Sequence, residues 1–208
     1  MILKIIGAAL FLVYALFLLS LYDFRKCFNK RCATFFLLGM ASFASVFVVQ
    51  VPIQKLLSRS VFFYNLSDTL QAILYAAVAG FVQEFFKALA AFYPGGDSLS
   101  GAAAGAGFGF TEVIFILGSA PYISFTAVLE RIFALMFHIS STTLVMFGKQ
   151  KGKFLISYIL LAFIHTAVDA IAVLFQMHYV TLTFTETSVA IISTSLFITS
   201  LLLYRRRS

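Results

Sequence analysis

The sequence predicts an all-α fold, a polytopic membrane bundle of about seven transmembrane helices that forms a single integral membrane domain over residues 1–208. Its composition excludes an ordinary soluble domain, because 62% of the residues are hydrophobic, 11% are charged and the mean hydropathy is +1.00. Its apolar runs are continuous and about 20 residues long, which favours helices over the alternating strands of a barrel. All three prolines, Pro52, Pro94 and Pro121, fall at the ends of these runs, where a missing N–H costs little.

The predicted spans follow from the apolar runs between polar breaks. In chain order they lie near residues 2–22, 32–52, 67–93, 100–118, 122–148, 154–178 and 185–204. The first span carries Lys4 near its start, yet it is longer than a usual signal-peptide core and lacks a small-residue cleavage site. We therefore expect it to be a membrane helix. The connection over 53–66 is expected to be either an amphipathic stretch on the outer membrane surface or a simple extracellular loop.

Basic residues predict the orientation of the bundle. Ten of them follow spans one, five and seven: Arg25, Lys26, Lys30, Arg31, Lys149, Lys151, Lys153, Arg205, Arg206 and Arg207. Only three, Lys4, Lys55 and Arg59, fall on the other face. The excess predicts that the N-terminus lies outside and the C-terminus in the cytoplasm, and the net charge of +7 reflects this topology rather than binding to nucleic acid. Two cysteines in one basic connection, Cys27 and Cys32, indicate neither a disulfide framework nor a metal-binding pair.

A set of ionisable residues lies deep within the predicted spans, where a charge is costly unless it has a partner or water. The set comprises Glu84, Lys87, Glu112, Glu130, Arg131, His138, His165 and Asp169. Five of these residues lie on four different spans at a similar depth, roughly 15–22 Å from the predicted cytoplasmic helix ends at 1.5 Å per residue. They are Glu84, Glu112, His138, His165 and Asp169. A shared polar cavity is cheaper than isolated burial of each group. The sequence therefore predicts one polar site built by four helices.

Helical spacing places the polar residues of each span on one stripe. Glu84 and Lys87 are three residues apart, His165 and Asp169 four, and Arg131 and His138 seven. The simplest interpretation of Lys87, Glu130 and Arg131 is that they form supporting ion pairs within the bundle. The fourth span also carries Gly101, Gly105 and Gly109, two successive GxxxG steps that let another backbone approach closely. We expect this span to be central.

This set of side chains is suited to amide hydrolysis. A carboxylate can take a proton from water while a histidine or a protonated carboxyl stabilises the oxyanion. The chain contains neither a GxSxG serine motif nor an HExxH zinc helix. A zinc site remains an open alternative: neutral His138 and His165 with Glu112 would supply three ligands, and Glu84 would then be the general base. Spacing does not separate the two mechanisms.

The order of these motifs resembles the PrsW and YhfC branches of the CAAX-protease/Abi superfamily of intramembrane proteases over residues 80–170. The motifs are the runs 84–87 (EFFK) and 108–112 (FGFTE), then Arg131 with His138, then the run 165–169 (HTAVD). Gln83 and Val113 depart from the PrsW pattern, and the surroundings of Arg131 and His138 look closest to YhfC. By this resemblance Glu84 activates water, Glu112, His138 and His165 complete the site, and Asp169 orients or supports it.

The resemblance implies a membrane peptidase in a prokaryotic plasma membrane. Its partners would be the lipid bilayer and a membrane-associated protein or peptide substrate. Such a peptidase would admit its substrate from the cytoplasmic side or laterally from lipid. The same superfamily includes the non-catalytic scaffold subunit of gamma-secretase, so an inactive scaffold that binds partners is the alternative function. A proton or ion transporter is a third reading, because membrane carboxylates and histidines also build relays. The chain shows no inverted repeat or pair of broken helices that would favour transport.

Overall fold

The computed structural model describes residues 2–120 and 124–206. Within these residues seven helices are long and apolar enough to cross a membrane, which confirms the predicted all-α membrane bundle. In chain order the helices are α1 (Ile2–Cys27), α2 (Lys30–Ser42), the π-helix η1 (Val46–Gln50), α3 (Val51–Ser58), α4 (Val61–Tyr64), α5 (Asp68–Ala91), α6 (Ser98–Ser119), α7 (Phe125–Gln150), α8 (Phe154–Gln176) and α9 (Leu182–Arg205). Pro121 and Arg207 lie outside the described residues.

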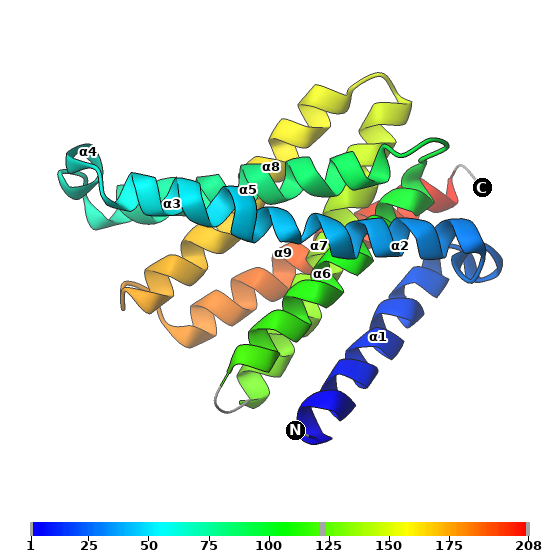
Figure 1. Ribbon diagram of the computed structural model, residues 1–208, viewed down its shortest axis with the longest axis horizontal. Coiled ribbons are helices and arrows are strands. Elements are labelled where there is room, and N and C mark those ends of the chain that lie inside the picture. Colours follow the sequence, from blue (N-terminus) through cyan, green and yellow to red (C-terminus); the bar gives the residue numbers. More distant parts are fainter. Residues whose placement is uncertain (1, 121–123, 207–208) are drawn as a thin grey trace.

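The helix ends gather at two ends of the bundle (Figure 1). One end carries the N-terminal ends of α1, α7 and α9 with the C-terminal ends of α6 and α8, at the lower left of the view. The α1–α2, α5–α6 and α7–α8 connections lie at the opposite end, together with the C-terminal end of α9. The basic clusters that follow α1 and α7 therefore share one end of the bundle. The end at which they lie is the one that the positive-inside bias predicts to be cytoplasmic.

The second membrane helix differs from its prediction. It extends from Lys30 to Ser58 through α2, η1 and α3, so the connection that was expected over 53–66 begins later, and Pro52 lies inside the span instead of at its end. Proline has no N–H to donate to the preceding turn. The backbone widens into a π-helix directly before Pro52 and continues as α3. Pro94 does lie between two helices, in the turn that separates α5 from α6.

Helix α6 is the central helix, as its glycines predict. Its most apolar window is 67% buried, the largest fraction among the seven spanning helices. A Cβ added at Gly105 would lie 2.2 Å from the His138 carbonyl oxygen of α7, and one at Gly107 would lie 1.9 Å from the Phe36 carbonyl oxygen of α2. Only glycine permits backbones to approach this closely, so α7 and α2 pack directly against opposite sides of α6.

Candidate active site

Glu84 of α5 is fully buried beside α8. The two helices touch closely at Gly80, where an added Cβ would lie 2.6 Å from the Thr166 hydroxyl oxygen. One turn further along α5, His165 Nδ1 donates a hydrogen bond of 2.8 Å to Glu84 Oε1. The same oxygen accepts a hydrogen bond of 2.6 Å from Lys87 Nζ, and the side chains of Glu84 and Lys87 are both 0% exposed. The i,i+3 pair predicted from the sequence is therefore a buried ion pair that a histidine extends to a second helix.

Lys87 carries the network from α5 to α7. Its ammonium donates to His138 Nδ1 and to Ser141 Oγ, each at 3.0 Å. Three donors on three partners complete the hydrogen-bonding capacity of a lysine ammonium, which offsets part of the cost of burying it. Sequence reasoning missed Ser141. The available signal was its position three residues after His138, on the same face of a helix.

His138 of α7 forms a hydrogen bond with Glu112 of α6, and Glu112 in turn lies beside a second cation, Arg131. Because His138 Nδ1 accepts from Lys87, the network assigns the proton to Nε2, which donates to Glu112 Oε2. The other oxygen of Glu112 lies 3.6 Å from Arg131 Nη1, and Arg131 also pairs with Glu130 through Nη2. Arg131 and His138 share a stripe of α7 as predicted, and Glu112 connects them.

The fourth helix contributes a histidine and an aspartate. His165 Nε2 lies 3.6 Å from Asp169 Oδ2, one turn further along α8. The rings of His138 and His165 are 5.4 Å apart between centroids, so the two histidines are neighbours. Phe108 and Phe137 line the site, with their ring centroids 5.5 and 5.7 Å from Lys87 Nζ. These aromatic walls keep the charges in an apolar setting, where electrostatic interactions are stronger than in water.

The structure thus brings all eight predicted residues into one network that spans α5, α6, α7 and α8. Their convergence is an observation of geometry, and their catalytic roles stay predictions. One atom of the network stands apart: Glu84 Oε2 is buried and has no hydrogen-bond partner within the described part of the chain. A buried carboxylate oxygen without a partner is costly and calls for an explanation, and a catalytic role or contact with water is one.

A second polar chain, which sequence reasoning missed, starts at the residue before Glu84. Gln83 Nε2 donates to Gln50 Oε1 at 3.0 Å, in the π-helix of the second span. Gln50 continues to Gln54 at 3.4 Å, and Gln54 donates to the Tyr75 carbonyl oxygen at 3.0 Å. The available signal was the presence of Gln50 and Gln83 within otherwise apolar runs. Hydrogen bonds between side chains of different membrane helices hold α5 against the second span.

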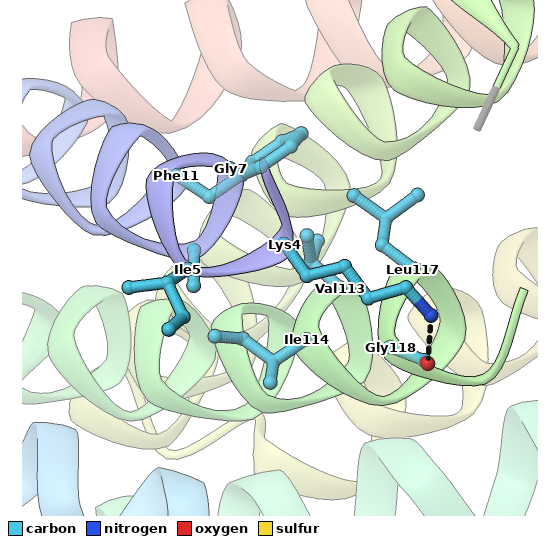
Figure 2. Close-up of a pocket in the computed structure, with 9 residues that line it drawn as sticks. Lys4, Ile5, Gly7, Phe11, Val113, Ile114, Leu117 and Gly118 are labelled. Atoms are coloured by element: carbon cyan, nitrogen blue, oxygen red, sulfur yellow. Dashed lines mark hydrogen bonds between the residues drawn. The ribbon is translucent and has the colours of Figure 1, made fainter. Parts of the chain in front are cut away.

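A pocket between α1 and α6 lies apart from the network. It encloses about 270 Å³ between α1 and α6, and Lys4 Nζ donates at 2.6 Å to the Gly118 carbonyl oxygen at its edge (Figure 2). The residues that line it are Lys4, Ile5, Gly7, Ala8, Phe11, Val113, Ile114, Leu117 and Gly118. This lining is almost entirely apolar and offers no group for hydrolysis.

The donor types at the site, two imidazoles with carboxylates, are those that zinc prefers. In the arrangement of the described residues, however, no three histidine, cysteine, aspartate or glutamate side chains converge on one point. The ammonium of Lys87 lies within hydrogen-bonding distance of both Glu84 and His138, and each histidine ring has carboxylate or ammonium partners at both nitrogens. The side chains therefore do not fit a three-ligand zinc centre as they are placed.

Comparison with known families supports a peptidase. Residues 117–191 match the family model described as YhfC intramembrane metalloprotease. The matched segment contains Glu130, Arg131, His138, His165 and Asp169, and it begins after Glu84 and Glu112. The match supports an integral membrane protein that acts as an intramembrane peptidase, while the wider PrsW and CAAX-protease placement stays a prediction. No curated protein and no solved structure matches the chain.

Proposed function

We propose that this protein is an intramembrane peptidase that hydrolyses a peptide bond of a membrane-associated protein or peptide, with Glu84 activating the attacking water. One observation carries the proposal. Glu84 is anchored through Oε1 by Lys87 and His165, while its buried Oε2 has no hydrogen-bond partner in the described part of the chain. A general base needs this combination of a fixed orientation and a free lone pair within reach of water.

The chemical step balances with this chain's own residues. Glu84 Oε2 takes a proton from water as the water oxygen bonds to the scissile carbonyl carbon, and the carbonyl oxygen becomes an oxyanion. Lys87 and the imidazole N–H groups are the donors available to stabilise that charge. The proton on Glu84 then passes to the leaving amine as the carbon–nitrogen bond breaks, which regenerates the carboxylate.

The remaining residues position these groups. Glu112 accepts from His138 and lies opposite Lys87 across the imidazole, so it fixes both the tautomer and the plane of the ring. Asp169 lies beside His165 Nε2 in the same way. Arg131 pairs with Glu112 and Glu130 and thereby compensates the second carboxylate. By the family resemblance we place the protein in a prokaryotic plasma membrane.

The test is the Glu84→Gln variant, which keeps the size and one hydrogen-bond acceptor but removes the base. Purified protein in proteoliposomes is offered membrane-anchored peptides, and cleavage is followed by mass spectrometry. We expect the cleavage rate to fall about 10²–10⁴-fold, the usual contribution of a general base. An Asp23→Asn variant, which makes the same carboxylate-to-amide change at the exposed ion pair with Lys26, serves as the control and keeps full activity. Turnover by the Glu84→Gln variant at the wild-type rate would exclude Glu84 as the base.

A partner-binding scaffold without catalysis is the second candidate. The observation in its favour is the complete burial of the Glu84–Lys87 ion pair, because a purely structural pair would be buried in the same way. The scaffold predicts that neither wild-type protein nor Asp23→Asn cleaves any peptide, and that Glu84→Gln leaves complex formation unchanged. The same preparations therefore separate the two functions.

A further inference from the structure

The network is closed at one end and partly exposed at the other. Side-chain exposure is 0% at Glu84 and Lys87, 17% at Glu112, 31% at Asp169 and 34% at Glu130. Both histidine side chains lie between these extremes, at 3% and 4%. A carboxylate that faces lipid is costly, so the partial exposure of two of them indicates contact with water.

The exposed residues all lie towards the same end of the bundle. Glu130 is five residues after the start of α7, Asp169 is seven residues before the end of α8, and Glu112 is seven residues before the end of α6. At 1.5 Å per residue they are roughly 8–11 Å from these helix ends. Figure 1 shows the three helix ends on one side of the molecule, away from the α5–α6 and α7–α8 connections.

Direct backbone packing closes the opposite end. Lys87 is only four residues before the end of α5, yet it is fully buried. Beside it, the N-terminal half of α6 lies against α7 at Gly101 and Gly105, where an added Cβ would come within 2.8 Å of a carbonyl oxygen. Gly118, near the other end of α6, is exposed beside the pocket between α1 and α6, and an added Cβ there meets nothing within 4 Å. Close packing of α6 on α7 therefore closes the network beside Lys87, while the partly exposed carboxylates lie towards the other helix ends.

We propose that water and substrate reach Glu84 from the end of the bundle where α6 and α8 finish and α7 begins, past Glu130 and Asp169. This inference rests on the proposed peptidase function and adds its direction of access. The basic residues of the α1–α2 and α7–α8 connections lie at the opposite end, so the access side is the face that the positive-inside bias predicts to be non-cytoplasmic. The substrate is then a peptide segment of a membrane protein that is presented at that face, in contrast to the cytoplasmic or lateral access expected from the sequence.

Cysteine labelling tests the direction of access without any need for activity. In a background with Cys27→Ser and Cys32→Ser, single cysteines are introduced as Glu130→Cys or Asp169→Cys. Two exposed positions mark the faces: Phe125→Cys at the start of α7 and Lys151→Cys after its end. A charged, membrane-impermeant maleimide is applied to intact cells and to inverted vesicles, and labelling is read by mass spectrometry.

We expect the Glu130→Cys and Asp169→Cys variants to be labelled from the same face as Phe125→Cys. They should not be labelled from the face that labels Lys151→Cys. The proposal would be overturned by labelling from the Lys151 face. It would equally be overturned if only a lipid-soluble maleimide reacted, or if neither that reagent nor the charged maleimide did. Because Glu130→Cys removes a partner of Arg131, Ala127→Cys, three residues earlier on the same face of α7, is the second reporter there. Labelling does not depend on peptide cleavage, so failure of this inference is distinct from failure of the peptidase function.

Discussion

His138 Nε2 and Glu112 Oε2 share a hydrogen bond that joins α7 to α6 inside the bundle. The opposite nitrogen of the same ring accepts from Lys87 of α5 at 3.0 Å, so one imidazole connects three membrane helices. A ring held on both sides has one tautomer and one orientation. The candidate site therefore depends on Glu112 even though Glu112 is not the proposed base.

Replacing Glu112 with glutamine should slow peptide cleavage about 10–100-fold, the usual effect of losing a residue that orients a functional histidine. The amide keeps the volume but no longer presents a charged acceptor to His138. Cleavage rates in proteoliposomes measure the effect, and Glu186→Gln on α9 is the control with the same chemical change outside the hydrogen-bonded network. Equal rates for Glu112→Gln and the control would contradict a positioning role.

Replacing Lys87 with methionine should destabilise the protein by about 3–5 kcal/mol, because Glu84 is then buried without its cation. The double variant Lys87→Met with Glu84→Gln removes both charges and should recover part of that loss. Thermal unfolding of the detergent-solubilised variants checks both expectations. A double variant that unfolds at the same temperature as Lys87→Met alone would show that the ion pair does not account for the loss.

Two glycines of α6 should respond differently to the same added methyl group. At Gly105 a Cβ would lie 2.2 Å from the His138 carbonyl oxygen, so Gly105→Ala should cost about 1–3 kcal/mol as α7 is pushed away. At Gly118 nothing lies within 4 Å, so Gly118→Ala is the matched control and should leave the unfolding temperature unchanged or slightly raised. Equal unfolding temperatures for the two variants would contradict the close packing of α6 on α7.

The placement of the donors predicts less than one equivalent of zinc in the purified protein, because in the described structure Lys87 and the carboxylates already pair with both histidines. Metal analysis of the detergent-solubilised protein, beside His138→Ala and His165→Ala, tests this. Stoichiometric zinc in the wild type that is lost in both variants would contradict the prediction and would show that these histidines form a metal centre once Lys87 has moved aside.

The spans and the members of the site could be predicted because both depend on local rules. The thickness of the bilayer sets the length of an apolar helix, and the cost of a charge in lipid makes Glu84, Glu112, His138, His165 and Asp169 stand out from their runs. Helical spacing then placed Lys87 beside Glu84 and the GxxxG glycines on one helix face. The orientation of the termini stays a prediction from the basic residues.

The second span shows where local rules stop. Proline at the end of an apolar run usually marks a boundary, yet Pro52 continues a helix because a π-turn before it absorbs the missing hydrogen bond. Whether a helix ends at a proline or continues through it depends on what packs around it. Here Gln50 and Gln54 hold the π-helical segment and α3 against α5, at Gln83 and the Tyr75 carbonyl.

The sequence by itself determined which residues are buried charges and on which helices they lie, because burial cost and helical period act within one segment. Only the tertiary structure decided the pairing: His138 with Glu112 and Lys87, His165 with Glu84, and Glu84 Oε2 with no partner in the described residues. These choices depend on how closely α5, α6, α7 and α8 approach and on how each is rotated. Those distances are set by glycine contacts between segments far apart in the chain, which no local pattern specifies.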